Sequence, residues 1–363
     1  MDMQTWLKQI LPTTISISKS TSPRAIVAAV ERQHDVIISY NTAKRAKKNH
    51  LEEDLQHQSH QFQLLPAYGV AVLSADPRAH VRLWVGDREG AKRFKQFFVC
   101  PGVSREAYRQ CRSVLAIDCT PANDAFDLVI LTATSVDAEN HVVLIAWALA
   151  DQESADAWRL FLSNLRSAVP EANDPSTTVV VEDCEKGLVP AQDEVPLSVR
   201  ALCLDALSRN LQKGCGLVAR KIFDSAIRTA STHQELLMGM GELQGVSPAA
   251  VAYLQGIDQS LWAEPYFLGR RYGHGTSQVA EIMDGLIGEE KKLSAVDLLQ
   301  ALWSKNRGLR SRHLQEATAL YPTVGLTEYA GGLLRQSCRL SSHQFSHPVD
   351  LHRAVVRADS GEW

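Results

Sequence analysis

Three apolar runs decide the fold of this chain: residues 113–117 (SVLAI), 128–134 (LVILTAT) and 141–148 (HVVLIAWA). Their β-branched and aliphatic residues are typical of buried strands. Residues 135–140 (SVDAEN) lie between the second and third runs and are polar, as the turn of a β-hairpin would be. We therefore expect three consecutive strands with antiparallel pairing.

Strands and helices alternate after these three runs. Residues 154–169 carry apolar side chains on one helical face, and Ser154 is placed to cap the start of that helix. Residues 177–181 (TTVVV) and 199–202 predict two further strands, and residues 205–212 predict a helix after the second of them. Three strands followed by strands that alternate with helices predict a mixed α/β sheet.

The regions around this core have a helical pattern. Residues 1–100 are mostly polar, with apolar residues at helical spacing, and residues 217–268 show the same pattern. The second region predicts a helical insertion inside the α/β core. We expect the following division of the chain: an N-terminal helical region (1–105), the first part of the core (106–213), a helical insertion (214–269), a helix that completes the core (270–302) and a helical, basic tail (303–363).

Composition excludes several classes of protein. Hydrophobic residues make up 45 % and charged residues 22 % of the 363 residues, a globular balance that excludes a disordered or fibrous chain. No apolar run approaches the ~20 residues that span a bilayer, so we expect no membrane segment. The seven cysteines form no CxxC pair and are odd in number, which indicates a reducing compartment. The net charge of −3 identifies no partner.

Three acidic residues occupy informative positions. Asp118 ends the first predicted strand, Asp183 follows the fourth, and Glu281 lies in a predicted helix that begins at Thr276 or Ser277. Clustered carboxylates repel one another unless a cation lies among them, and hard divalent ions prefer oxygen ligands. The sequence thus allows a three-carboxylate metal site. It also allows a plainer interpretation, in which the aspartates are turn or cap residues and the glutamate is on a solvated helix face.

Five ordered segments carry a resemblance to a known family. They are residues 114–120 (VLAIDCT), 142–149 (VVLIAWAL) with 152–162 (QESADAWRLFL), 179–188 (VVVEDCEKGL), 203–210 (CLDALSRN) and 262–281 (WAEPYFLGRRYGHGTSQVAE). Over roughly residues 25–335, the sequence resembles the transposase core of Mutator-like elements, the MULE transposases.

The resemblance implies a ribonuclease H-like fold and a DDE recombinase. It implies that Asp118, Asp183 and Glu281 are the catalytic and metal-binding residues and hold two Mg²⁺ or Mn²⁺ ions. The expected activity is DNA strand cleavage and strand transfer at transposon ends. The expected partners are double-stranded DNA, both terminal inverted repeats and target DNA, and further copies of the chain. The expected location is the nucleus.

The sequence departs from the family pattern at several positions. Ala206 stands where the family has a histidine, and Cys119 stands where it has a glycine after the first aspartate. Ile282 and Asp284 replace a serine and an asparagine after the glutamate, and no zinc-finger or SWIM spacing of cysteine and histidine is present. Two alternatives therefore stay open. One is a domesticated, inactive DNA-binding or transcription-regulating protein, and the other is a structure-specific nuclease without strand transfer.

Basic side chains in three places are candidates for contacts with the DNA backbone. The first group could also be a nuclear address, and the pattern favours a solvated helix face over either function. The candidates are Lys44, Arg45, Lys47 and Lys48 in the N-terminal region, Arg271 and His274 ahead of Glu281, and Lys305, Arg307, Arg310 and Arg312 in the tail.

Overall fold

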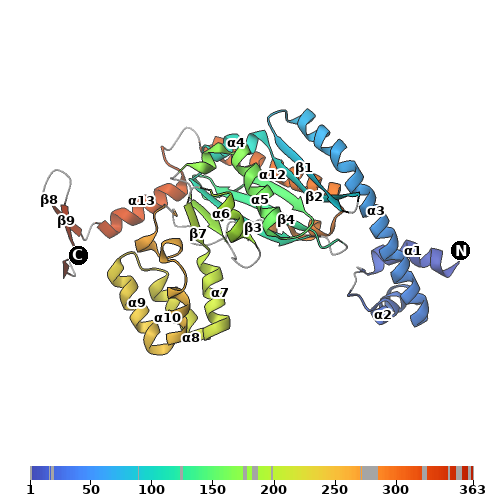
Figure 1. Ribbon diagram of the computed structural model, residues 1–363, viewed down its shortest axis with the longest axis horizontal. Helices are drawn as coiled ribbons and strands as arrows, with labels where there is room; N and C mark the ends of the chain where they lie inside the picture. The colour runs from blue at the N-terminus through green and yellow to red at the C-terminus, as the bar shows by residue number, and fades with distance from the viewer. Residues whose placement is uncertain are drawn as a thin grey trace.

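A seven-stranded sheet forms the centre of the molecule in the computed structural model (Figure 1). The structure describes residues 2–15, 17, 20–88, 90–122, 126–174, 178–181, 187–197, 199–269, 271, 285–320, 325–341, 344–348, 354–358 and 361–362. The strands of this sheet are β1 (His80–Arg88), β2 (Ala91–Cys100), β3 (Val114–Pro121), β4 (Val129–Val136), β5 (Val142–Ala150), β6 (Thr178–Val181) and β7 (Val199–Leu202). Their spatial order is β1-β2-β5-β4-β3-β6-β7.

The sheet is mixed, as the sequence predicts. The neighbours among β1, β2, β5, β4 and β3 all pair antiparallel. In contrast, β6 pairs parallel with β3, and β7 pairs parallel with β6. The β4–β5 turn is built by Asp137, whose Oδ1 accepts the backbone N–H groups of Glu139 at 2.9 Å and His141 at 2.8 Å. Asn140 in this turn has a φ of 68°, a left-handed conformation that asparagine tolerates. The predicted hairpin and the α/β class are confirmed.

Helices cover both faces of the sheet, which explains why every residue of β5 is buried. One face packs against α5 (Ala155–Ala168) and α6 (Leu188–Glu194), and we call it the α5 face. The other face packs against α3 (Tyr40–Ala75) and α12 (Ala295–Leu320), and we call it the α12 face. Ser154 caps α5 by accepting the backbone N–H of Ala157, in agreement with the prediction.

The prediction of a mostly helical region over the first hundred residues is wrong for residues 80–100. These residues form β1 and β2, which extend the sheet beyond β5. The physical reason is an alternating pattern: Phe97 faces the α12 face and its neighbour Phe98 faces the α5 face. Gly90, with a φ of 79°, supplies the left-handed turn between the two strands.

Two helical lobes lie apart from the sheet (Figure 1). The first contains α1 (Met3–Thr14), α2 (Pro23–His34) and the start of α3, around a core of its own. The long helix α3 continues from this lobe onto the sheet, where Leu65 and Val72 are buried. The second lobe follows β7 and has a separate apolar core, as a helical insertion would. Its elements are α7 (Leu204–Cys215), α8 (Leu217–Ile222), a π-helical turn η2 (Phe223–Ile227), α9 (His233–Val246), α10 (Pro248–Gln255), η3 (Gln259–Leu261) and η4 (Glu264–Tyr266).

The C-terminal part differs from the predicted helical tail. Helix α12 belongs to the core, because Leu298, Leu299 and Leu302 are buried on the α12 face. It runs past the predicted boundary at residue 302 and is followed by α13 (Glu328–Ser341). Three short strands then form a second antiparallel sheet, which the polar character of this segment did not suggest. They are β8 (Gln344–Pro348), β9 (Ala354–Ala358) and β10 (Gly361–Glu362), while the remaining short helices are α4 (Gly102–Tyr108), η1 (Pro170–Asn173) and η5 (Gly288–Lys292).

Candidate functional site

Asp118 is a buried carboxylate on the inner strand β3, with 7 % of its surface exposed. Its neighbour in the chain, Ile117, packs on the α5 face, and Ala116 packs on the α12 face. Because successive side chains of a strand point to opposite faces, Asp118 belongs to the α12 face, like Ala116.

A row of side chains runs across the sheet from Asp118. Asp118 is in register with Thr132 of β4, and Thr132 is in register with Trp147 of β5. Trp147 is fully buried and meets Trp303 of α12 edge-to-face, with ring centroids 6.2 Å apart. Helix α12 thus shields one end of this row from water, and the carboxylate lies at the other end.

The strands β6 and β7 end beside Asp118, whereas β3 continues past it to Pro121, so the prediction that Asp118 ends its strand is wrong. Val181 of β6 is in register with Ile117, the residue before Asp118, and with Leu202 of β7. The second predicted ligand, Asp183, follows Val181 by two residues in the sequence but lies outside the described residues. The third, Glu281, also lies outside them, so the structure gives no distance between the three predicted carboxylates.

The described residues on both sides of the segment that contains Glu281 pack on the α12 face. On one side, Phe267 packs against a small cluster formed by Val114, Ala201, Cys203 and Ala206. On the other side, Ile287 is buried in the apolar core beneath α12. The described residues before and after this segment therefore pack on the same face of the sheet as Asp118.

Ala206, the residue at the position of the family histidine, lies in the first turn of α7. It is 6 % exposed and packs in the small apolar cluster with Cys203, whose sulfur caps the helix by accepting the N–H of Ala206 at 3.4 Å. The methyl group supplies packing at this position and no group for acid–base chemistry.

Residues 114–210 match the family model of the MULE transposase domain. This part of the chain is therefore similar to a MULE transposase domain. The match runs from β3 to the middle of α7 and includes Asp118, Asp183 and Ala206. Glu281 lies outside it. No curated protein matches the chain. A transposase domain implies DNA as a partner, and among the described residues no helix has the length and apolarity needed to cross a membrane.

Arg271, predicted to contact DNA, is buried beside the MULE transposase domain with 4 % of its surface exposed. Its Nη2 donates to the carbonyl oxygen of Leu261 at 3.0 Å, and its guanidinium carbon lies 4.1 Å from the ring centre of Phe267. Its Nε is 3.5 Å from a carboxylate oxygen of Glu264. Burial lowers the pKa of Arg271 to about 10. In this structure Arg271 braces the end of the helical insertion, and His274 lies outside the described residues.

The four basic candidates of α12 have different surroundings. Lys305 is partly exposed and is held in place, because its Nζ lies 2.9 Å from Oε1 of Glu290 and donates to the carbonyl oxygen of Leu286. Arg310 is half-buried, and this burial lowers its pKa. Arg307 and Arg312 are exposed. A role in DNA binding stays a prediction for all four.

The basic residues of α3 lie in the N-terminal lobe and apart from Asp118 (Figure 1). Lys44 and Arg45 are exposed. Lys48 forms a weak surface ion pair with Glu52, in which Nζ lies 3.7 Å from Oε1. Lys47 donates to the carbonyl oxygen of Thr21 at 2.7 Å and so fastens α3 to the segment before α2. The structure does not bring this group together with the basic residues of α12.

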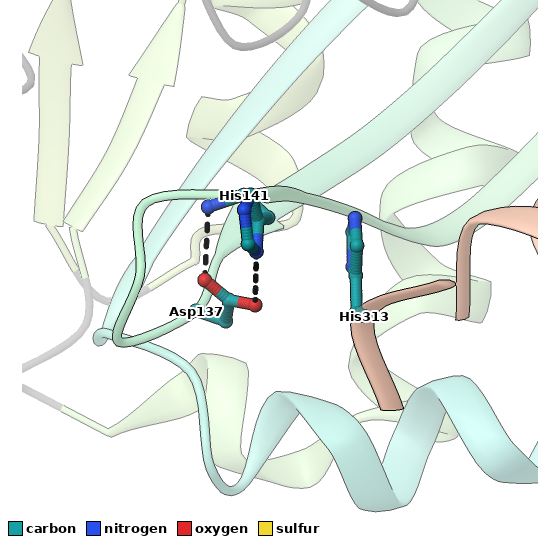
Figure 2. Close-up of side chains that lie close together, drawn as sticks. All are labelled: Asp137, His141 and His313. Carbon is teal, nitrogen blue, oxygen red and sulfur yellow. Dashed lines mark hydrogen bonds and ion pairs between the residues drawn. The ribbon is translucent and has the colours of Figure 1, made fainter. Parts of the chain in front are cut away.

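Sequence reasoning missed a group of possible metal ligands in the β4–β5 turn and α12. One side-chain ligand atom from each of Asp137, His141 and His313 lies within 4.8 Å of the other two (Figure 2). His313 follows His141 by 172 residues (313 − 141), and no spacing motif joins them. The sequence therefore contained no signal for this group, because only the packing of α12 against the turn creates it.

Proposed function

We propose that this protein cleaves DNA at transposon ends and transfers the freed strand to target DNA. The matched MULE transposase domain supports a transposase-like activity in general. The observation that carries the finer proposal is the position of Asp118: a carboxylate on the inner strand β3, 7 % exposed, at the point where the parallel strands β6 and β7 end beside it. The mixed sheet is compatible with a ribonuclease H-like core.

In this proposal Asp118, Asp183 and Glu281 form one site. Asp183 follows by two residues a strand end that is in register with Ile117, which supports its approach to Asp118. For Glu281, the support is that the chain packs on the α12 face both before and after it, at Phe267 and at Ile287. Both arguments rest on described neighbours.

The donor chemistry of the three residues fits a hard divalent cation. Carboxylate oxygens are the ligands that Mg²⁺ prefers, and a group of buried carboxylates is tolerated only beside positive charge. Two Mg²⁺ or Mn²⁺ ions held by Asp118, Asp183 and Glu281 would supply charge neutralisation at the scissile phosphate. The apolar core of the α12 face keeps water from one side of Asp118, and the paired strands β4 and β6 fix its backbone.

The exposed basic residues supply the DNA contacts in this proposal. Arg307 and Arg312 are exposed on the helix whose buried side covers the α12 face. Lys44 and Arg45 offer a second cationic group on the N-terminal lobe. Such contacts hold the phosphate backbone without reading the sequence. We further propose that paired transposon ends are held by more than one copy of the chain, and that the protein acts in the nucleus.

The test is a strand-cleavage and joining assay with the full chain. The substrate is a labelled duplex that contains the inverted repeat flanking the gene, and a scrambled duplex is the control. With Mg²⁺ or Mn²⁺, we expect cleavage and joining to a plasmid target. Asp118→Asn, Asp183→Asn and Glu281→Gln should each lower cleavage by about 1000-fold or more, since each removes one carboxylate from the metal site.

Glu242→Gln is the matched control, because Glu242 is exposed on α9 in the helical insertion. It should cleave like the unmodified protein. Cleavage by Asp118→Asn at the unmodified rate would overturn the site assignment. Cleavage without joining would replace the transposase proposal with the nuclease alternative. Specific binding of the repeat without any cleavage would favour the domesticated regulator.

A further inference from the structure

The β4–β5 turn presents two polar side chains toward α12. The backbone N–H groups of Glu139 and His141 both bind Oδ1 of Asp137, which holds this carboxylate in place. Its second oxygen, Oδ2, lies 3.3 Å from Nδ1 of His141 (Figure 2). The two side chains are thus oriented by the turn itself.

Helix α12 adds two more polar side chains to the same place. The ring of His313 stacks on the ring of His141, with centroids 4.6 Å apart and planes 19° from parallel. Glu316, one helical turn later, places Oε2 3.5 Å from Nε2 of His141. His141 therefore has a carboxylate near each ring nitrogen and a second imidazole against its face.

We propose that Asp137, His141 and His313 bind a divalent transition-metal ion of the zinc class. Two imidazoles and one carboxylate are a donor set that suits Zn²⁺, and three protein ligands leave a fourth position for water. Ligand atoms about 2.0–2.1 Å from a tetrahedral ion are about 3.3 Å apart. The 3.3 Å between Oδ2 of Asp137 and Nδ1 of His141 already has this spacing. All three ligand atoms lie within 4.8 Å of one another, and binding would require the His313 ring to turn out of its stack on His141.

Glu316 has the position of a second carboxylate that orients a ligand. A metal-binding histidine commonly turns its other ring nitrogen toward a carboxylate, which fixes the tautomer and makes the ligating nitrogen more basic. With Nδ1 of His141 on the metal, Nε2–H faces Glu316. Burial and the neighbouring His141 ring lower the pKa of His313.

The site has an access route. A cavity of about 210 Å³ adjoins the ligands, and Asp137 and His313 both line it. Its other walls include Cys111 and Arg310. Small ions and water can therefore reach the fourth position from solvent.

This site lies away from Asp118. Asp137 follows Thr132, the partner of Asp118, by five residues (137 − 132). At about 3.4 Å per residue, that is roughly 17 Å along β4. The metal would join the β4–β5 turn to α12. The residue before α13 also contacts this turn, because Oγ1 of Thr327 donates to the carbonyl oxygen of Ala138 at 2.9 Å. The expected role is therefore structural, fastening α12 and α13 to the sheet.

The test is metal binding by the full chain after treatment with a chelator. Titration with Zn²⁺ against a chromophoric competitor should give one site of micromolar or tighter affinity, and Zn²⁺ should raise the unfolding temperature. His141→Ala and His313→Ala should each weaken binding by roughly 100-fold or more. His57→Ala is the matched control, because His57 is exposed on α3, and it should bind like the unmodified protein.

Co²⁺ provides a readout that does not depend on activity. Visible absorption bands of tetrahedral Co²⁺ without a thiolate charge-transfer band would support ligation by nitrogen and oxygen. A thiolate band would overturn the assignment, since it would place the ion on a cysteine. No Zn²⁺ site of micromolar affinity, or equal affinity in His313→Ala, would also overturn it. Since His313 is partly exposed on α12, where alanine favours the helix, this variant should fold even if His141→Ala does not.

Discussion

Asp118 and Thr132 face each other across β3 and β4, and both are almost fully buried, at 7 % and 2 % exposed. A carboxylate at such a position is stabilised by a bound cation, so Mg²⁺ should stabilise the folded protein by mass action. We expect saturating Mg²⁺ to raise the unfolding temperature by about 1–3 °C. Asp118→Asn should fold but lose this shift, as measured by calorimetry.

Asp193→Asn is a suitable control for the Mg²⁺ effect. Asp193 is an exposed carboxylate paired with Arg200 at 2.9 Å on the surface, and its removal should leave the shift unchanged. An Mg²⁺ shift of the same size in Asp118→Asn would show that the ion binds elsewhere.

Gly187 precedes α6 in a conformation that other residues avoid. Its φ is 94°, and a Cβ built there would lie 2.4 Å from the backbone nitrogen of Ala155 and 2.9 Å from its Cα. The left-handed backbone and the clash with a main chain together predict that Gly187→Ala lowers the free energy of unfolding by about 2–5 kcal/mol. Urea denaturation measures this change.

Gly214, unlike Gly187, has room for a side chain. It lies in α7, and a methyl group added at its Cα would have no atom within 4 Å apart from its chain neighbours and the backbone of its own helix. Gly214→Ala should therefore raise the free energy of unfolding by up to about 1 kcal/mol. Equal effects of the two substitutions would show that the close approach of Gly187 to α5 does not exist in solution.

The core strands could be predicted because their signal is local. Residues 128–134 and 141–148 are continuous apolar runs with a polar turn between them, and burial on both faces of the sheet demands such runs. The strands β1 and β2 could not be recognised in this way. They lie toward the edge, where residues such as Arg82 and Lys95 alternate with apolar ones, and this pattern resembles an amphipathic helix over a short window.

The candidate site residues also differ in whether a local sequence pattern could predict them. Asp118 was predictable as a candidate because it directly follows a short apolar run, although β3 continues past it to Pro121. The role of Arg271 was not predictable, since its burial against Phe267 depends on how the helical insertion folds back. The group of Asp137, His141 and His313 depends on the register of α12 against the sheet, which no local pattern determines.

A buried polar link joins α12, α4 and β5 through Ser104. Its Oγ donates to the carbonyl oxygen of Leu144 at 3.0 Å and accepts Nδ2–H of Asn306 at 3.1 Å. Ser104 is fully buried, so in Ser104→Ala the carbonyl of Leu144 and the amide of Asn306 lose a hydrogen-bond partner that water cannot replace. We expect a loss of about 1–3 kcal/mol in the free energy of unfolding, measured by urea denaturation.

The matched substitution is Ser74→Ala on the exposed surface of α3. The Ser74 hydroxyl donates to the carbonyl oxygen of Val70, and its loss is compensated by water, so the change should stay within about 0.5 kcal/mol. A Ser104→Ala protein as stable as Ser74→Ala would exclude the buried link.

Alkaline pH should destabilise the protein through Cys100. Burial raises the pKa of this thiol from 9.0 to about 12, so the folded protein keeps the proton that the unfolded chain loses. The stabilisation is complete below pH 9 and is lost as pH rises toward 12, with a slope of up to about 1.4 kcal/mol per pH unit from this one group. Cys100→Ala should flatten the fall of unfolding free energy in this interval, whatever its effect at neutral pH. Cys338→Ala is the control, because this thiol is exposed, and it should leave the slope unchanged. An unchanged slope in Cys100→Ala would contradict the prediction. The alkaline sensitivity would then come from another group, such as the half-buried Tyr68, because burial raises its pKa to about 12.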